Sequence, residues 1–307
     1  MYRCLFRAVL LALGLLVTPS TQAWELVVVV SDAGGAYGEF ANALQQFVEG
    51  SAWNIRWSGD GDAFARAAPK ADLIIAVGSE ATRSSLKRTT APVLATLLPR
   101  QAFEKIAAEL DSPRPRGSLS AIYLDQPVHR LLGLAHHLLP DRPHVGVLTG
   151  TDSRAQIPAL RMTASSQGQL IVTEDVDGET PLITALQQVF ARSDLLLALP
   201  DNVIYRRENV RTILLTSYRF QKPLIGFSQA LVSAGALAGV FSTPSQIARQ
   251  TADFLRMWTP EGSGLPPPQM PTLFTIAVNR NVAQALGLKL PDEPALRRAL
   301  GADKEGK

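Results

Sequence analysis

Residues 25–31 read ELVVVVS, and residues 72–80 read DLIIAVGSE. Each stretch joins a short apolar run to small or polar residues, after which the apolar positions recur with helical spacing. Uninterrupted apolar runs of this length are typical of strands that are buried on both faces of a parallel sheet. The same pairing of strand and helix recurs along the chain, so the sequence predicts an α/β fold of parallel strands covered by helices.

About ten such runs are predicted to be strands, and they form two successive sets on either side of Pro140. The runs are 25–31, 72–77, 92–97, 119–124, 144–149, 170–174, 195–199, 223–227, 238–242 and 273–278. Two sets of this size predict two lobes, each an open, doubly wound parallel sheet. Such sheets bind ligands outside the carboxyl ends of their strands, so the loops after the strands are expected to carry the function. These loops begin at Ser31, Gly78, Leu124, Gly150, Pro200 and Ser228.

Three polar stretches are expected to lack regular structure. Asp60 and Asp62 flank Gly61 as in part of a calcium loop, but Phe64 and Arg66 stand where further oxygen ligands would be needed, which favours a turn. Residues 259–271 contain three consecutive prolines and predict a linker. Residues after Pro291 are polar and are expected to be frayed.

The N-terminus has the pattern of a secretory signal peptide. Arg3 and Arg7 precede a ten-residue apolar run, 8–17, and the small-residue stretch Thr21-Gln22-Ala23 follows. We predict cleavage after Ala23, giving residues 1–23 as the signal peptide and a secreted, periplasmic protein. The run is shorter than the roughly 20 residues that span a bilayer, so an uncleaved anchor is the less favoured interpretation. Cys4 lies before the apolar run and cannot be a lipid-attachment residue at the cleavage point, so no lipoprotein is predicted.

Composition excludes several classes of protein. The chain of 307 residues is 46% hydrophobic and 19% charged, with a net charge of +3. Its basic residues are scattered rather than clustered, so no nucleic-acid partner is expected. Cys4 is the only cysteine, and without it the mature chain has no disulfide, no catalytic thiolate and no cysteine-ligated metal.

No catalytic set emerges from the motifs. Gly226-Phe227-Ser228-Gln229-Ala230 is similar to a nucleophile elbow, but a hydrolase of that class needs a histidine after its serine. All four histidines precede it: His129, His136, His137 and His144. His136 and His137 are adjacent and would point about 100° apart on a helix, so they do not form a metal face. We therefore expect no enzyme, no cofactor and no metal site, but a binding cleft formed by loops rich in small polar residues.

The second half of the chain resembles a known family. VFSTPSQIARQTA at 240–252, FTIAVNRNVAQALGLKLP at 274–291 and Pro200-Asp201-Asn202-Val203 are similar to the ABC-transporter substrate-binding proteins that include TrpX-like receptors. The resemblance implies the type I periplasmic binding protein fold, two α/β lobes joined by three crossovers. It places lobe one at 24–123 plus 244–270, and lobe two at 124–243 plus 271–307. The chain departs from the family at 35–38, where GAYG replaces a common His-Pro pair, and at 151–154, where TDSR replaces an Asn and Glu pattern.

The implied function is that of a receptor whose lobes close on a small organic ligand, an amino acid or a similar carboxylate, for an ABC permease in the inner membrane. The alternative is a sensory or scaffold subunit that passes a ligand-dependent change to a membrane sensor. Asp32 or Asp201 could pair with a ligand amine, Tyr37 and Phe227 could form an apolar wall, and the helix start at 79–82 resembles one that family members use for a carboxylate. The candidate ligand-binding residues are Ser31, Asp32, Tyr37, Ser79, Glu80, Thr82, Thr151, Ser153, Asp201, Asn202, Phe227 and Ser228.

Overall fold

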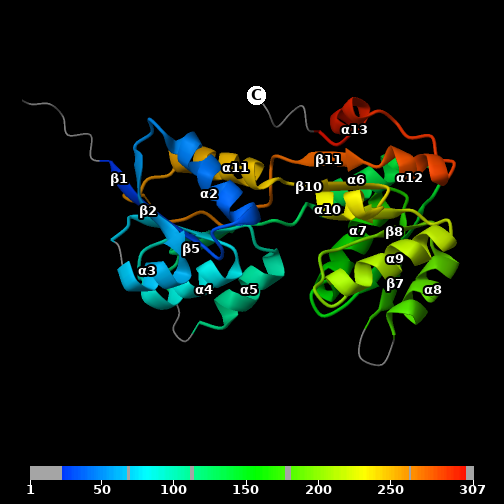
Figure 1. Cartoon of the computed structure of the whole chain (residues 1–307), viewed down its shortest axis with the longest axis horizontal. Coiled ribbons are helices and arrows are strands. Elements are labelled where there is room, and N and C mark those ends of the chain that lie inside the picture. The colour runs from blue at the N-terminus through cyan, green and yellow to red at the C-terminus, as the bar shows by residue number, and fades with distance from the viewer. Residues whose placement is uncertain (1–22, 68–69, 111–113, 177–180, 263, 302–307) are drawn as a thin grey trace, which may run out of the picture.

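The computed structural model describes residues 23–67, 70–110, 114–176, 181–262 and 264–301. The predicted signal peptide, up to residue 22, lies outside the described residues. Two groups of strands and helices lie side by side and are joined by extended segments (Figure 1). Each group is built on its own sheet, as the α/β prediction required. We call the group on the first sheet the first lobe and the group on the second sheet the second lobe.

The first sheet is parallel, and its described strands lie in the order β2-β1-β3-β4-β5. The strands are β1 (Trp24–Val30), β2 (Trp53–Asp60), β3 (Leu73–Val77), β4 (Val93–Thr96) and β5 (Leu119–Ile122). Successive side chains of a strand point to opposite faces, so both faces of β1 are apolar and both must be covered. Leu26 and Val28 pack in a core with α2 (Gly35–Val48) and α11 (Pro244–Met257).

Val27 and Val29 face the opposite core of the same sheet. The helices on that side are α3 (Gly61–Ala67), α4 (Ser79–Arg88) and α5 (Arg100–Ala108). α2 and α11 are far apart in the sequence but lie side by side on the first sheet (Figure 1). Residues 244–257 therefore pack on the first sheet, although they lie between β10 and β11 of the second in chain order.

The second sheet has the order β11-β10-β9-β8-β6-β7 over the described residues. Its strands are β6 (His144–Thr149), β7 (Leu170–Asp175), β8 (Leu195–Leu197), β9 (Leu224–Gly226), β10 (Ala238–Phe241) and β11 (Thr275–Val278). One face packs under α6 (Val128–Leu138), α7 (Ile157–Ser166), α12 (Arg280–Ala285) and α13 (Glu293–Ala299). The other face packs under α8 (Leu182–Arg192), α9 (Arg207–Arg219) and α10 (Gln229–Ala234). A short 3₁₀ turn, η1 (Arg154–Gln156), precedes α7.

β11 is the exception to the parallel arrangement, because it runs antiparallel to β10. The chain leaves β10 for α11 on the first lobe and then returns from that side. A strand that re-enters the sheet where β10 left it must run in the opposite direction. The antiparallel strand therefore follows from the crossing of the chain between the lobes.

The turn predicted around Asp60 and Asp62 is wrong. Asp60 ends the edge strand β2, and α3 begins at Gly61 with Asp62 in its first turn. The Asp60 carboxylate accepts a hydrogen bond from the Ala63 N–H at 2.7 Å, which satisfies one free donor of the helix start. The strand was missed because its sequence, WNIRWSGD, alternates between apolar and polar residues, whereas the prediction relied on continuous apolar runs.

The predicted linker is more ordered than its prolines suggested. The Leu265 N–H donates to Gly117 O at 2.6 Å, the Gln269 N–H donates to Ala121 O at 2.8 Å, and Gln269 O accepts from the Tyr123 N–H at 2.9 Å. The segment therefore runs along the outer edge of β5, parallel to it. Proline lacks an N–H but is tolerated at a sheet edge, where only part of the backbone pairs.

The frayed C-terminus is also a wrong prediction for residues 293–299, which form α13. The Asp292 carboxylate caps this helix by accepting from the Ala295 N–H at 2.7 Å. Leu296 is 1% exposed and packs in the core of the second lobe. A single apolar side chain and a cap anchor this polar helix.

Gly264→Ala is expected to destabilise the first lobe. Gly264 has φ +90°, and a Cβ there would lie 3.0 Å from Gly117 O and 3.1 Å from Gly117 Cα, so both strain and crowding oppose the substitution. We expect a loss of about 2 kcal/mol or more in the free energy of unfolding, measured by urea denaturation. Gly287→Ala is the matched control, because Gly287 has φ +65° but no atom within 4 Å of the added Cβ. Equal losses in the two variants would show that the contact with Gly117 has no role.

Candidate functional site

A cavity of about 790 Å³ lies between the two lobes. The loops that line it follow β3, β4 and β5 of the first sheet and β6, β8 and β9 of the second. These are the carboxyl ends of parallel strands, where ligands of α/β sheets bind. The volume is in the range of small-molecule sites. We call this cavity the cleft.

The wall from the first lobe is positively charged. Ser79 is the first residue of α4, whose N-cap, Gly78, has φ 90° and makes no side-chain capping bond. The first N–H groups of a helix have no partner within it and carry partial positive charge. Arg83 and Lys105 line the same cavity, and Arg83 is paired with Glu80 at 2.9 Å. This wall suits an anionic group.

The wall from the second lobe includes an aromatic pair beside the polar side chains of Asp152, Gln156 and Asn202. The rings of Tyr205 and Phe227 meet edge to face with their centroids 5.5 Å apart. The Tyr205 hydroxyl is buried and has no hydrogen-bond partner among the described residues. Burial raises the pKa of this hydroxyl, and the negative charge of Asp201 raises it further. Tyr205 is therefore a neutral group that can donate or accept one hydrogen bond.

Asp201 organises the loops of the second lobe. Its Oδ2 accepts from the Asp152 N–H at 3.1 Å, from the Ser153 N–H at 3.0 Å and from the Ser153 hydroxyl at 2.8 Å. Its Oδ1 accepts from the N–H groups of Val203 at 2.9 Å and Ile204 at 3.3 Å. Asp201 is 4% exposed, and its carboxylate already accepts five hydrogen bonds. These bonds join the loop after β6 to the loop after β8. The predicted pairing of Asp201 with a ligand amine stays a prediction.

Four of the twelve predicted ligand-binding residues line the cleft: Ser79, Asp201, Asn202 and Phe227. Thr151 lies at its margin, where its carbonyl accepts a hydrogen bond from Gln101 Nε2 at 2.8 Å. Asp32 is exposed and bonds to the Gly34 N–H, and Tyr37 packs against the core of the first lobe. Glu80 is exposed and forms the ion pair with Arg83.

The remaining predicted hydroxyls have structural hydrogen bonds. Ser31 Oγ donates to Val77 O and accepts from the Ala81 N–H, both at 3.0 Å. Thr82 is fully buried and donates to Gly78 O at 2.8 Å. Ser153 holds Asp201, and Ser228 caps α10. Roles in ligand binding for these residues stay predictions.

Sequence reasoning missed Gln101, Asp125 and Tyr205, which also line the cleft. Gln101 follows β4, whose loop is not among those predicted to carry the function. The available signal was the strand end at Thr96, followed by Pro99 at the start of a helix. Asp125 lies in the first crossover, the stretch 124–126 that joins β5 of the first sheet to α6 of the second lobe, and its Oδ2 caps α5 by accepting from the Arg100 N–H at 2.5 Å. Tyr205 gave no signal beyond lying five residues after a strand-end proline.

The segments that join the two sheets are held to one another by buried hydrogen bonds. Gln126 Nε2 donates to Ser242 Oγ at 2.9 Å, and Ser242 Oγ donates to Leu273 O at 2.6 Å. Arg130 Nη1 donates to Gln126 Oε1 at 2.8 Å and to Pro271 O at 3.0 Å, and its guanidinium lies 4.0 Å from the centre of the Phe274 ring. These contacts bring together the stretches near 124–126, 242–243 and 271–273.

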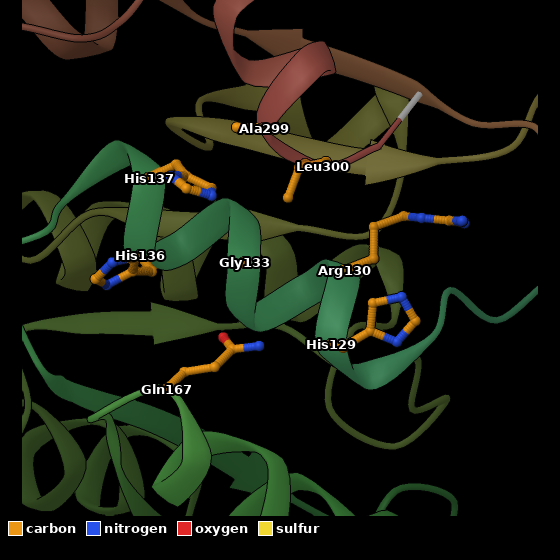
Figure 2. Close-up of a pocket in the computed structure, with 8 residues that line it drawn as sticks. All are labelled: His129, Arg130, Gly133, His136, His137, Gln167, Ala299 and Leu300. Carbon is orange, nitrogen blue, oxygen red and sulfur yellow. The ribbon is translucent and has the colours of Figure 1, made fainter. Parts of the chain in front are cut away.

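A second, smaller cavity of about 360 Å³ lies away from the cleft, around α6. Figure 2 shows α6 crossing between Gln167 on one side and Ala299 and Leu300 on the other. The rings of His136 and His137 are 5.5 Å apart, and burial, together with the neighbouring His136, lowers the pKa of His137. Within the described ranges, no three His, Cys, Asp or Glu residues are grouped so that they could hold a metal.

No protein-family model matches the chain, and no curated protein matches it in sequence. Solved structures do match it in fold. A ligand-free, open structure of a substrate-binding protein with adhesive properties from Clostridium difficile has a TM-score of 0.67 and 18% identity, covering 88% of this chain and 96% of that one. The ABC domain in complex with L-Trp from Streptococcus pneumonia has a TM-score of 0.62 and 16% identity, covering 91% and 98%. A periplasmic ribose ABC transporter structure from Conexibacter woesei has a TM-score of 0.52 and 14% identity, covering 87% and 95%.

The chain has the substrate-binding-protein fold. These neighbours are of the kind that the resemblance at 240–252 and 274–291 implied, and at such low identity the likeness is one of fold. The cavity of this chain lies between its two sheets. None of the helices in the described ranges has both the length and the hydropathy that crossing a membrane requires.

Asp201→Asn is expected to lower the free energy of unfolding by at least about 2 kcal/mol. The new amide NH2 would replace one carboxylate oxygen and would face the N–H or O–H groups that now donate to it. Urea denaturation measures the change. Asp152→Asn is the control, because Asp152 lines the same cleft but accepts only from the Asn202 N–H, at 3.2 Å, which an amide oxygen can still do. A loss no larger than that of the control would contradict the organising role of Asp201.

Asp125 predicts a pH dependence of stability. Burial raises the pKa of its carboxyl above the usual value, against the opposing effect of the hydrogen bond from the Arg100 N–H. The folded state therefore binds more protons than the unfolded state just above the usual carboxyl pKa, and stability falls as the pH rises through the raised pKa. Asp125→Asn removes this titration and keeps an oxygen for Arg100.

The Asn variant should therefore gain stability relative to the wild type as the pH rises from about 4 towards 7. Urea denaturation at several pH values gives the difference in the free energy of unfolding at each. Asp32→Asn, at an exposed carboxylate of the first lobe, controls for the loss of one negative charge. A difference between Asp125→Asn and the wild type that stays constant over this range would show that Asp125 does not titrate there.

Proposed function

We propose that this chain is an exported, periplasmic solute-binding receptor of an ABC importer, and that its two lobes close on a small organic carboxylate such as an amino acid. The observation that carries the proposal is the cleft of about 790 Å³, lined from both sheets by the carboxyl ends of their strands. The pattern of residues 1–23 supports export, and the resemblance at 240–252 and 274–291 supports the partnership with a permease.

The chemistry of the cleft supports a carboxylate ligand with an apolar body. The start of α4 at Ser79, with Arg83 and Lys105 beside it, would receive the carboxylate. Tyr205 and Phe227 would pack against the apolar part from the other lobe. Such a ligand touches both lobes only when the cleft is shut, so it favours closure by its differential contacts.

We also propose that the lobes are 24–123 plus 244–270 and 124–243 plus 271–307, with a hinge at the three crossovers. The packing of α11 on α2 supports this division, as do the hydrogen bonds of Leu265 and Gln269 to the β5 edge. Phe274, Ile276 and Leu296 pack in the core of the second lobe, which supports the assignment of the last segment.

Calorimetric titration of the purified protein with the twenty amino acids and a panel of small carboxylates tests the proposal. L-tryptophan is the first probe, because one structural neighbour was solved with L-Trp. We expect saturable binding of at least one compound with a stoichiometry of one. A panel in which nothing binds would contradict the receptor function.

Phe227→Ala should weaken the binding of the identified ligand by about tenfold or more, because one aromatic wall of the cleft is lost. Phe220→Ala is the matched control, since Phe220 is an aromatic residue of the same lobe that stacks on Phe190 outside the cleft. Equal effects of the two substitutions on the dissociation constant would show that the ligand does not contact Phe227.

A further inference from the structure

One side chain joins the two lobes directly across the cleft. Gln101, the second residue of α5 in the first lobe, donates from Nε2 to the carbonyl of Thr151 in the second lobe at 2.8 Å. Within the described part of the chain, one other side-chain hydrogen bond joins the lobes outside the crossover stretches, from Thr275 Oγ1 to Gln246 Oε1 at 3.3 Å, and it lies beside the crossovers and not across the cleft. The bond from Gln101 to Thr151 exists only while the lobes are close together.

The oxygen of the same amide group makes the closed form less favourable. Gln101 Oε1 is buried and has no hydrogen-bond partner among the described residues. A buried acceptor without a partner costs about as much as, or more than, one intramolecular hydrogen bond contributes, because water would satisfy it in the open state. The donor half of the amide therefore favours closure, and the acceptor half opposes it.

The backbone next to Gln101 is bonded to the first crossover. The Arg100 N–H donates to the carboxylate of Asp125 in the first crossover at 2.5 Å. The next residue, Gln126, bonds to Ser242 in the second crossover. The start of α5 is thus attached to the segment about which the lobes would rotate, so the reach of Gln101 to Thr151 depends on the hinge angle.

We propose that Gln101 is a balanced latch of the cleft. On closure its Nε2 gains one hydrogen bond and its Oε1 becomes buried without a partner, so Gln101 stabilises the contact between the lobes without closing them by itself. The inference rests on the proposed function, because with a latch of this kind the binding of the ligand determines whether the closed form predominates. A receptor needs this balance, since a strong latch would shut the empty cleft and a missing one would weaken the closed complex.

Two substitutions of Gln101 separate the halves of the amide. Gln101→Lys keeps a donor for Thr151 O and removes the stranded acceptor, so the closed form should become more populated. Gln101→Glu keeps an acceptor and removes the donor, which places a carboxylate beside the Thr151 carbonyl, so the open form should become more populated. The two variants should shift the equilibrium in opposite directions.

Distances between spin labels measure the shift without a ligand. Lys87 on α4 and Gln187 on α8 are exposed residues of different lobes, and Lys87→Cys with Gln187→Cys in a Cys4→Ser background gives one labelled pair. Pulsed dipolar measurements should show a larger closed fraction in Gln101→Lys and a smaller one in Gln101→Glu than in the unsubstituted labelled protein.

Gln156→Lys and Gln156→Glu are the matched controls. Gln156 is a glutamine of the same cleft on the second lobe, so these variants bring the same charges into the same space. They should leave the distance distribution of the ligand-free protein unchanged. Shifts of equal size in the Gln156 variants, shifts in the same direction for both Gln101 variants, or no shift at all would overturn the latch.

Titration with L-tryptophan, or with the panel compound that binds, adds a second readout. The dissociation constant should fall in Gln101→Lys and rise in Gln101→Glu, each by about threefold to tenfold. If no compound binds the wild type, the proposed function fails, while the ligand-free distances still decide whether Gln101 is a latch. If ligand binds but the distances do not respond to Gln101, the latch fails and the function stands.

Discussion

Buried hydrogen bonds among the three crossovers hold the two sheets in their mutual orientation. Gln126, Ser242 and the carbonyl of Leu273 form a continuous chain of such bonds, and Arg130 adds the carbonyl of Pro271. Buried polar groups of this kind cannot exchange partners for water without cost, so the crossovers stay together. Each lobe has its own apolar cores on both faces of its sheet, and the segments that join the sheets are few and narrow. The fold therefore concentrates any relative motion of the lobes at one place.

The loops around the cleft serve two purposes at once. Asp201, Ser153 and Ser31 use their oxygens to satisfy backbone N–H groups at strand ends and helix starts. That role joins the loops after β6 and β8, which lie beside Tyr205 on the wall of the second lobe. The cleft has the aromatic pair Tyr205 and Phe227 on one lobe and the basic side chains of Arg83 and Lys105 on the other. A ligand with both an apolar body and an anionic group complements the two walls only when they approach.

Much of the architecture could be predicted from residue order. The continuous apolar runs of β1 and β3 predicted strands covered on both faces, and the packing of Val27 and Val28 into different cores confirms this. β2 could not be predicted in the same way, because Asn54 and Arg56 on one of its faces are exposed while Trp53 and Ile55 on the other pack against the core, so its sequence shows only alternation. α13 escaped prediction because one buried leucine and one aspartate cap are enough to fix a short polar helix that packs on a larger lobe.

The candidate site was predictable in its place but only partly in its members. Chain order shows which loops follow strands, and parallel strands end at the same edge of a sheet, so the residue order was enough to predict that a cavity would lie at these loops, as it does. The sequence could not show that the Asp201 carboxylate accepts hydrogen bonds from backbone N–H groups 48 or 49 residues away. Nor could it show that Gln101 donates a hydrogen bond to Thr151 across the cleft. Those contacts join residues of different loops and different lobes, and they arise only when the crossovers set the two sheets face to face. Local periodicity indicates which side chains are buried, whereas the partner of a polar atom depends on the three-dimensional path of the chain and is seen only in the folded structure.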